Sequence, residues 1–129
     1  MVWNSSDAWL LQTILQSTIK NPSVDLNGII AVGDYINHAI FNWEEFFGGM
    51  ERLMSAKYVK EKNGKFSLTP FFHKQYEAFG KAPKSMAKEY LFLKEFLEAN
   101  PISEKVKKVE LKITAETFRA AVEVYQKRV

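Results

Sequence analysis

Residues 58–70, YVKEKNGKFSLTP, place two runs of alternating residues on either side of Asn63-Gly64, and this pattern decides the fold. Asn-Gly is the preferred pair for a two-residue type I′ turn, because both central residues need positive φ angles. Such a turn also fixes the strand register, in which Lys62 lies opposite Lys65. The sequence therefore predicts a short antiparallel β-hairpin.

The two faces of this hairpin differ in chemistry, because successive side chains of a strand point to opposite sides. One face is apolar with a single acid near its tip, and it comprises Val59, Glu61, Phe66 and Leu68. The other face is basic and polar, and it comprises Lys60, Lys62, Lys65 and Ser67. Lysine also protects exposed strands from unwanted pairing. The basic face is therefore either a solubilising surface or a contact for nucleic acid.

Composition limits the class of protein. The chain has 129 residues, of which 47% are hydrophobic, enough for one compact domain with an added arm and too few for two large domains. It has no cysteine, which excludes disulfides and cysteine-ligated metals. Its first residues lack the basic region and cleavage site of a signal peptide, and no apolar run is long enough to span a membrane. We expect a cytoplasmic protein without a membrane partner.

Most of the chain has the apolar periodicity of helices. Helices are expected from Ser5 or Ser6 to about Asn21, over 26–37, over 42–57 and from Pro70 to Gly80, with a short extended piece at 24–26. The third helix is the best defined, because Asn42 can cap it and Glu45 stands at the third helical position. Gly48 and Gly49 inside it favour close packing or a kink.

Three helices, a hairpin and a further helix are the order of a winged helix-turn-helix domain. Residues 51–70, ERLMSAKYVKEKNGKFSLTP, combine a helix end, a strand led by a hydrophobic residue, a glycine turn, an aromatic residue and Leu-Thr-Pro. Over residues 5–80 the chain resembles the small bacterial winged-helix proteins of the PadR and MarR type. It departs from them at Phe72, where such proteins often have glycine.

The expected fold is mainly α with a small β-hairpin (α+β). It consists of a winged helix-turn-helix domain over residues 1–80 and a C-terminal helical extension over residues 81–129. The resemblance implies a transcriptional regulator that binds double-stranded DNA, with helix 42–57 as recognition helix and residues 58–68 as wing. The expected DNA contacts are Arg52 and Ser55 on the helix and Lys60, Lys62, Lys65 and Ser67 on the wing.

The charge distribution favours an alternative. The outward face of helix 42–57 carries Glu44, Glu45 and Glu51 against one base. Residues 1–56 hold two basic and six acidic side chains, a sum of 2 − 6 = −4, and residues 57–129 hold 16 and 9, a sum of +7, which together give +3. DNA affinity comes largely from Lys and Arg. The alternative is a winged-helix module for protein–protein interaction without sequence-specific DNA binding.

The C-terminal extension adds a further helix, capped by Ser85 and ended by Asn100-Pro101, with a broad apolar stripe. Either this stripe packs on the first helix of the same chain, or it forms a homodimer interface, as the resemblance implies. The expected partner-binding residues are Tyr90, Leu93, Phe96 and Leu97. A pocket between the two regions would suit a small apolar effector.

The residues that follow are ambiguous in structure. Val109, Leu111 and Ile113 alternate with charged residues and suggest a strand, although helical spacing also fits residues 103–113. A last helix begins after Thr114.

Catalysis is not expected. Asp34 and His38, like His73 and Glu77, are four residues apart and share a helix face, but two ligands do not make a metal site. The chain has only two histidines and no glycine-rich phosphate loop. We therefore expect no catalytic residues, no metal and no cofactor.

Overall fold

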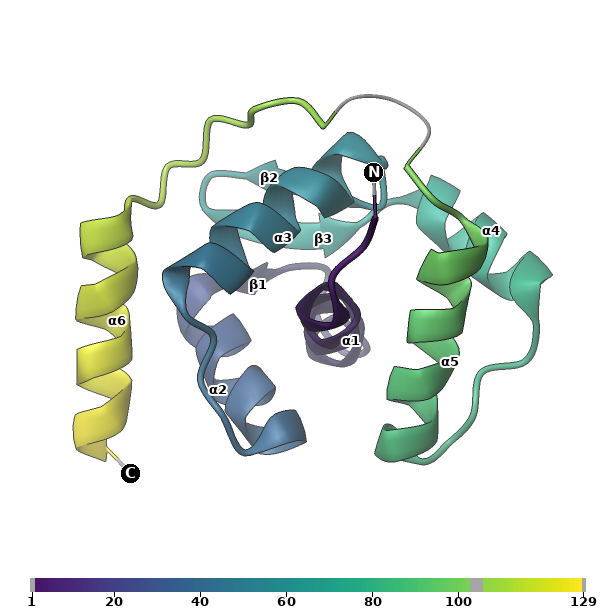
Figure 1. Cartoon of the computed structure of the whole chain (residues 1–129). Coiled ribbons are helices and arrows are strands. Elements are labelled where there is room, and N and C mark those ends of the chain that lie inside the picture. Colours follow the sequence, from purple (N-terminus) through teal and green to yellow (C-terminus); the bar gives the residue numbers. More distant parts are fainter. Residues whose placement is uncertain (1, 103–105, 129) are drawn as a thin grey trace.

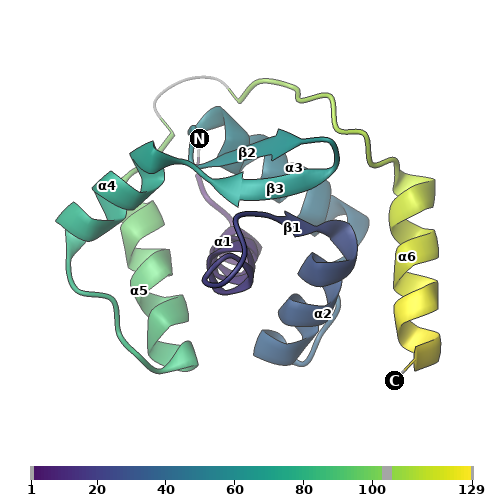
Figure 2. The ribbon, with the colours of Figure 1, turned by 180° about the vertical axis from the view of Figure 1, so that it is seen from behind.

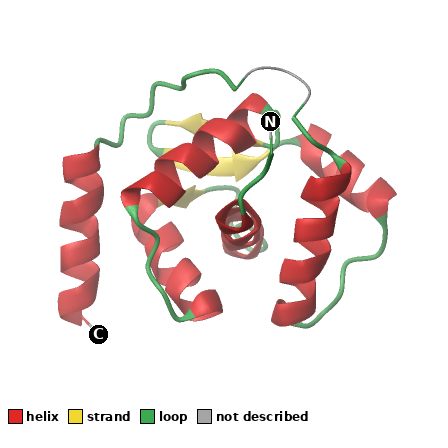
Figure 3. Cartoon of the chain, in the orientation of Figure 1, coloured by secondary structure: helices red, strands yellow, loops and turns green. Residues whose placement is uncertain are grey.

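The computed structural model describes residues 2–102 and 106–128. This part of the chain forms helices with a small sheet at one end of the molecule (Figures 1 and 3). The elements are α1 (Ser5–Ser17), β1 (Val24–Asp25), α2 (Leu26–Asn37), α3 (Trp43–Ser55), β2 (Val59–Lys62), β3 (Lys65–Leu68), α4 (Pro70–Phe79), α5 (Met86–Ala99) and α6 (Ala115–Arg128). The predicted α+β class is confirmed, and the order of elements is compatible with a winged helix.

The hairpin has the predicted register. Its Cα partners are Val59 with Leu68, Lys60 with Ser67, Glu61 with Phe66 and Lys62 with Lys65. The φ angles of Asn63 and Gly64 are 54° and 77°, both positive as a type I′ turn requires. The extended piece before α2 becomes a third strand, because β1 pairs with β3 and gives the order β1-β3-β2 (Figure 2).

Local capping explains where the helices begin. At the start of α3, the Asn42 side chain accepts a hydrogen bond from Glu45 N at 2.7 Å, and the Glu45 carboxylate accepts one from Asn42 N at 3.0 Å. Thr69 caps α4 in the same way, accepting from Phe72 N at 3.0 Å. The first helix differs slightly from the prediction, because Asn4 is its N-cap and it ends at Ser17.

The core is built around α1, which lies between α2 and α3 on one side and α5 on the other (Figure 1). Leu10, Leu11 and Ile14 of α1 have no exposed surface. The close contact with α3 depends on Gly49, because a Cβ there would lie 2.8 Å from Leu10 Cδ2. Gly49 thus serves close packing, one of the two roles predicted for the glycines of this helix.

Residues 106–114, which we call the strap, run along the wing side of the molecule and lead into α6 (Figure 1). The strap is neither strand nor helix, so the strand predicted from Val109 to Ile113 is wrong, and so is the helical alternative over 106–113; residues 103–105 lie outside the described residues. The alternation does bury Ile113. However, the strap backbone bonds to side chains instead of a neighbouring strand, as in Lys112 N to Glu61 Oε2 at 3.4 Å.

Candidate nucleic-acid interface

The wing presents its lysines to solvent. Lys60, Lys62 and Lys65 are exposed on one face of the hairpin, and Ser67 beside them is half-buried. The opposite face packs into the core through Val59, Phe66 and Leu68, which anchors the hairpin. The sequence-predicted wing residues are therefore brought together on one surface.

The strap adds a cation that sequence reasoning missed. Lys112 Nζ donates a hydrogen bond to Asn63 Oδ1 at 3.3 Å, which places a further ammonium group at the wing tip. The tip also carries the facing pair Lys62 and Lys65. No local signal predicts this, because Lys112 is 49 residues from Asn63.

Helix α3 presents little surface for reading bases. Of residues 43–55 only Glu44 is largely exposed, and the others are buried or half-buried. The helix packs on α1 below, while α6 contacts it through Phe118, whose ring lies 5.1 Å from Phe46 and 5.7 Å from Trp43. Glu45 and Glu51 are half-buried, so the outward acidic face is narrower than the helical wheel predicts.

Arg52 is held in an ion pair instead of projecting outward. Its Nε lies 2.7 Å from Asp7 Oδ2, and its Nη2 lies 2.9 Å from Asp7 Oδ1. The Asp7 side chain is 0% exposed and that of Arg52 is 12% exposed. Removing one partner of such a buried pair typically costs about 3–5 kcal/mol, because a charge is left uncompensated. Arg52 therefore fastens α3 to α1 and is not free for a DNA contact in this structure.

Ser55 is also engaged within the chain. Its hydroxyl accepts a hydrogen bond from Lys107 N at 3.0 Å and lies 3.4 Å from Lys107 O. Of the six predicted DNA contacts, the four on the wing share one face, whereas the two on α3 are bonded to other parts of the chain.

The predicted partner-binding residues lie mostly in the core. Leu93 and Phe96 are 0% exposed and Leu97 is 1% exposed. Phe96 is surrounded by the rings of Tyr58, Phe72, Tyr76 and Phe79 at centroid distances of 5.5–5.6 Å. In this structure the apolar stripe of α5 packs within its own chain, so these three side chains are not available to a second copy.

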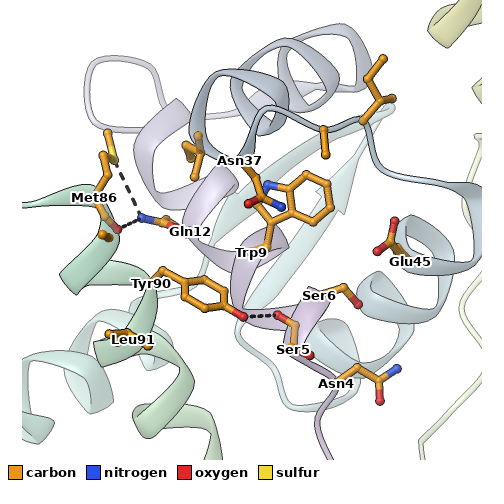
Figure 4. A pocket seen from close by; sticks show the side chains of 14 residues that line it. Asn4, Ser5, Ser6, Trp9, Gln12, Asn37, Glu45, Met86, Tyr90 and Leu91 are labelled. Carbon is orange, nitrogen blue, oxygen red and sulfur yellow. Dashed lines mark hydrogen bonds between the residues drawn. The ribbon is translucent and has the colours of Figure 1, made fainter.

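Tyr90 is half-buried, and its hydroxyl donates to Ser5 O at 3.2 Å. It borders a cleft of about 900 Å³ between α1, α2 and α5 (Figure 4). The cleft lies where a pocket was expected, between the first region and the extension. Its lining is mixed, because Gln12, Asn37 and Glu45 stand among the apolar residues.

Asp34, a member of one of the four-apart pairs, contacts another helix. Asp34 Oδ2 accepts a hydrogen bond from Tyr125 OH at 2.7 Å, which links α2 to α6. This hydrogen bond, with smaller contributions from burial and the Asp34 charge, raises the pKa of Tyr125. Within residues 2–102 and 106–128, no group of three or more His, Cys, Asp or Glu could hold a metal ion.

No protein-family model matches this chain, and no curated protein or solved structure matches it either. The helices in the described ranges are all too short or too polar to cross a bilayer. The class that the structure defines is a mostly helical α+β domain with a small three-stranded antiparallel sheet.

Proposed function

We propose that this chain is a cytoplasmic transcriptional regulator of the winged-helix type, which binds double-stranded DNA through its wing. The observation that carries the proposal is the exposed basic face of the wing, formed by Lys60, Lys62 and Lys65. Lys112 adds a fourth cation through its hydrogen bond to Asn63 at the wing tip. The order α1-β1-α2-α3-β2-β3 supports it, because a winged helix places its hairpin directly after the recognition helix.

Local electrostatics favour phosphate binding at the wing. Glu61 is the hairpin's one acid, and it lies on the core-facing side, where it accepts from Lys112 N. The Debye length is about 8 Å at physiological salt, so distant acids on α3 are largely screened. Three or four phosphate contacts would give a slope of log affinity against log salt of about −3.

The mode of binding follows from the state of α3. Arg52 is paired with Asp7 and Ser55 with Lys107, so neither contributes a base contact in this proposal. Affinity then comes from the DNA backbone with weak sequence preference, because phosphate contacts carry no direct sequence information. A homodimer remains part of the proposal, but its surface lies outside Leu93, Phe96 and Leu97.

Charge reversal on the wing tests the proposal. The variant Lys60→Glu/Lys62→Glu/Lys65→Glu should lose at least about 100-fold in affinity for a 20-base-pair duplex, because three attractive phosphate contacts become repulsive. The matched control is Lys74→Glu/Lys81→Glu/Lys88→Glu, exposed lysines of the α4–α5 region. Both variants change the net charge from +3 to 3 − 6 = −3. Fluorescence anisotropy at several salt concentrations measures both.

If the wing variant and the control variant bound the duplex with equal affinity, the wing would not be part of the DNA interface. A second candidate function, a protein-interaction module, is favoured by one observation: α3 exposes Glu44 and holds its one arginine in an ion pair, so it has no free cation for DNA. A module of that kind binds duplex DNA neither tightly nor in a salt-dependent manner, so the same titration separates the two functions.

A further inference from the structure

The cleft between α1, α2 and α5 lies at the end of the molecule away from the wing (Figures 1 and 4). Its walls come from the first turns of α1 and α5 and the last turn of α2 with the loop after it. A volume of about 900 Å³ is within the range of small-molecule sites. The cleft does not include the wing lysines, so a ligand here is independent of the proposed DNA contact.

Gln12 supplies an unused hydrogen-bond acceptor to this cleft. Its side-chain Nε2 donates to Met86 O at 2.9 Å (Figure 4). The same nitrogen donates to Glu89 Oε1 at 3.0 Å. Carbonyl and carboxylate oxygens only accept, so the amide nitrogen must face them and Oε1 must point away.

The Gln12 Oε1 atom is buried and has no hydrogen-bond partner among the residues that the structure describes. Gln12 is 0% exposed and is one of the residues that line the cleft, so this buried oxygen lies just below the surface of the cleft wall. Buried acceptors are normally satisfied, so an oxygen left over here indicates a donor from outside the chain.

The charged residue that lines the cleft disfavours an anion. The described residues that line it include no Lys, Arg or His, and Glu45 contributes a carboxylate. Glu89 lies behind Gln12. The helix N-termini at the cleft, those of α1 and α5, already have acids in their first turns, Asp7 and Glu89. A neutral or cationic ligand therefore fits, and a carboxylate does not.

Two aromatic rings are held in place beside the Gln12 amide (Figure 4). Trp9 Nε1 donates to Gly33 O at 3.1 Å, and Tyr90 OH donates to Ser5 O at 3.2 Å. Rings fixed in advance lose little conformational freedom when a flat ligand binds. Met86 and Leu91 add apolar surface.

We propose that this cleft binds a small planar aromatic molecule that is neutral or cationic and carries an N–H donor, such as an aromatic carboxamide. The N–H group donates to Gln12 Oε1, and the ring lies against Trp9 and Tyr90. This ligand differs from a purely apolar effector, because the buried Gln12 oxygen requires a donor.

Benzamide and benzoate test the chemistry, since they share a ring and differ in donor and charge. The readout is the indole N–H resonance of Trp9 in a titration followed by NMR. Trp3 and Trp43 serve as internal controls, because neither lines the cleft. A ligand of this size should bind with Kd of about 1 mM. Benzoate should bind at least about tenfold more weakly, because it lacks the donor and meets carboxylates.

Two alanine substitutions on α5 locate the binding. Ala87 lines the cleft and is exposed, whereas Ala99 is exposed on the same helix and does not line it. Ala87→Phe should fill the cleft and abolish the benzamide-dependent shift, and Ala99→Phe should retain it. Gln12→Met should weaken benzamide about tenfold by removing the acceptor; if that variant does not fold, the alanine pair decides.

Three results would overturn the proposal: no saturable shift of the Trp9 resonance up to about ten times the expected Kd, benzoate binding as tightly as benzamide, or an undiminished shift in Ala87→Phe. A shift confined to Trp9, selective for benzamide and lost only in Ala87→Phe supports it. Loss of DNA binding in the wing variants leaves this test unaffected.

Discussion

Tyr76 is a buried phenol whose hydroxyl has no hydrogen-bond partner among residues 2–102 and 106–128. Its ring contacts those of Phe72 and Phe96 in the aromatic cluster between α4 and α5. Burial, and secondly the charge of Glu89, raises the pKa of Tyr76 to about 12. The ionised form is therefore strongly disfavoured in the folded protein.

This pKa predicts a loss of stability at alkaline pH. Between pH 10 and 12 the unfolded chain loses the Tyr76 proton while the folded chain keeps it. The free energy of unfolding therefore falls by on the order of 2 kcal/mol across this range. Tyr76→Phe should reduce this fall, and at pH 7 it should be neutral or stabilising by up to about 1 kcal/mol, because an unpaired hydroxyl is removed. Urea unfolding at pH 7, 10 and 11 measures both; an undiminished alkaline loss in the variant would contradict the assignment.

The sequence predicts correctly that the wing lysines of the candidate interface are exposed, but it does not predict the contacts of Arg52 and Ser55. The wing lysines are exposed because strand alternation follows directly from the hairpin register. Arg52 and Ser55 were assigned from a helical wheel, which shows the outward face but not what covers it. Their partners, Asp7 and Lys107, are 45 and 52 residues away.

At the scale of elements, short-range chemistry accounts for what sequence predicted well. The type I′ turn and the caps at Asn42 and Ser85 involve residues no more than three apart, and all three appear as predicted. The strap shows the limit of periodicity. Apolar and charged residues alternate in the strap because one side of it faces the core. A strand also needs the backbone of a neighbouring strand as hydrogen-bond partner, whereas the strap amides bond to the side chains of Ser55 and Glu61.

Two adjacent glycines of α3 test the packing against α1. Gly49→Ala would place a Cβ 2.8 Å from Leu10 Cδ2 and 3.1 Å from Asp7 Oδ1, so we expect a destabilisation of about 1–3 kcal/mol. Gly48→Ala would meet the Arg52 guanidinium at 3.3 Å, and its gain in helix propensity of about 1 kcal/mol offsets that contact. Denaturant unfolding compares the two. Equal stabilities would mean that α3 does not approach α1 this closely.

At the scale of the whole molecule, the C-terminal extension completes the core. The stripe of α5 covers α1, and α6 covers α2 and α3 through Phe118 and the Tyr125–Asp34 hydrogen bond. The division into residues 1–80 and 81–129 describes the sequence pattern, whereas the buried side chains of both regions form one hydrophobic cluster.

Phe118 should therefore contribute strongly to stability. It is 2% exposed, and Phe118→Ala should cost about 3–5 kcal/mol, as for other buried phenylalanines. It should also speed hydrogen exchange of α6 amides while α5 stays protected. Phe71, which is 45% exposed, provides the control, and Phe71→Ala should cost about 1 kcal/mol or less. A loss in Phe118→Ala no greater than in Phe71→Ala would show that α6 adds little to the core.

The sequence by itself determined the hairpin, its register, the caps at Asn42 and Ser85 and the basic face of the wing, because each depends on interactions within a few residues. The tertiary structure decided that Arg52 binds Asp7, that α5 is core, that Lys112 joins the wing tip and that a cleft opens beside Gln12. These outcomes join residues 45 or more positions apart, and such pairs are selected by how helices pack and which buried charges find partners, not by local propensity.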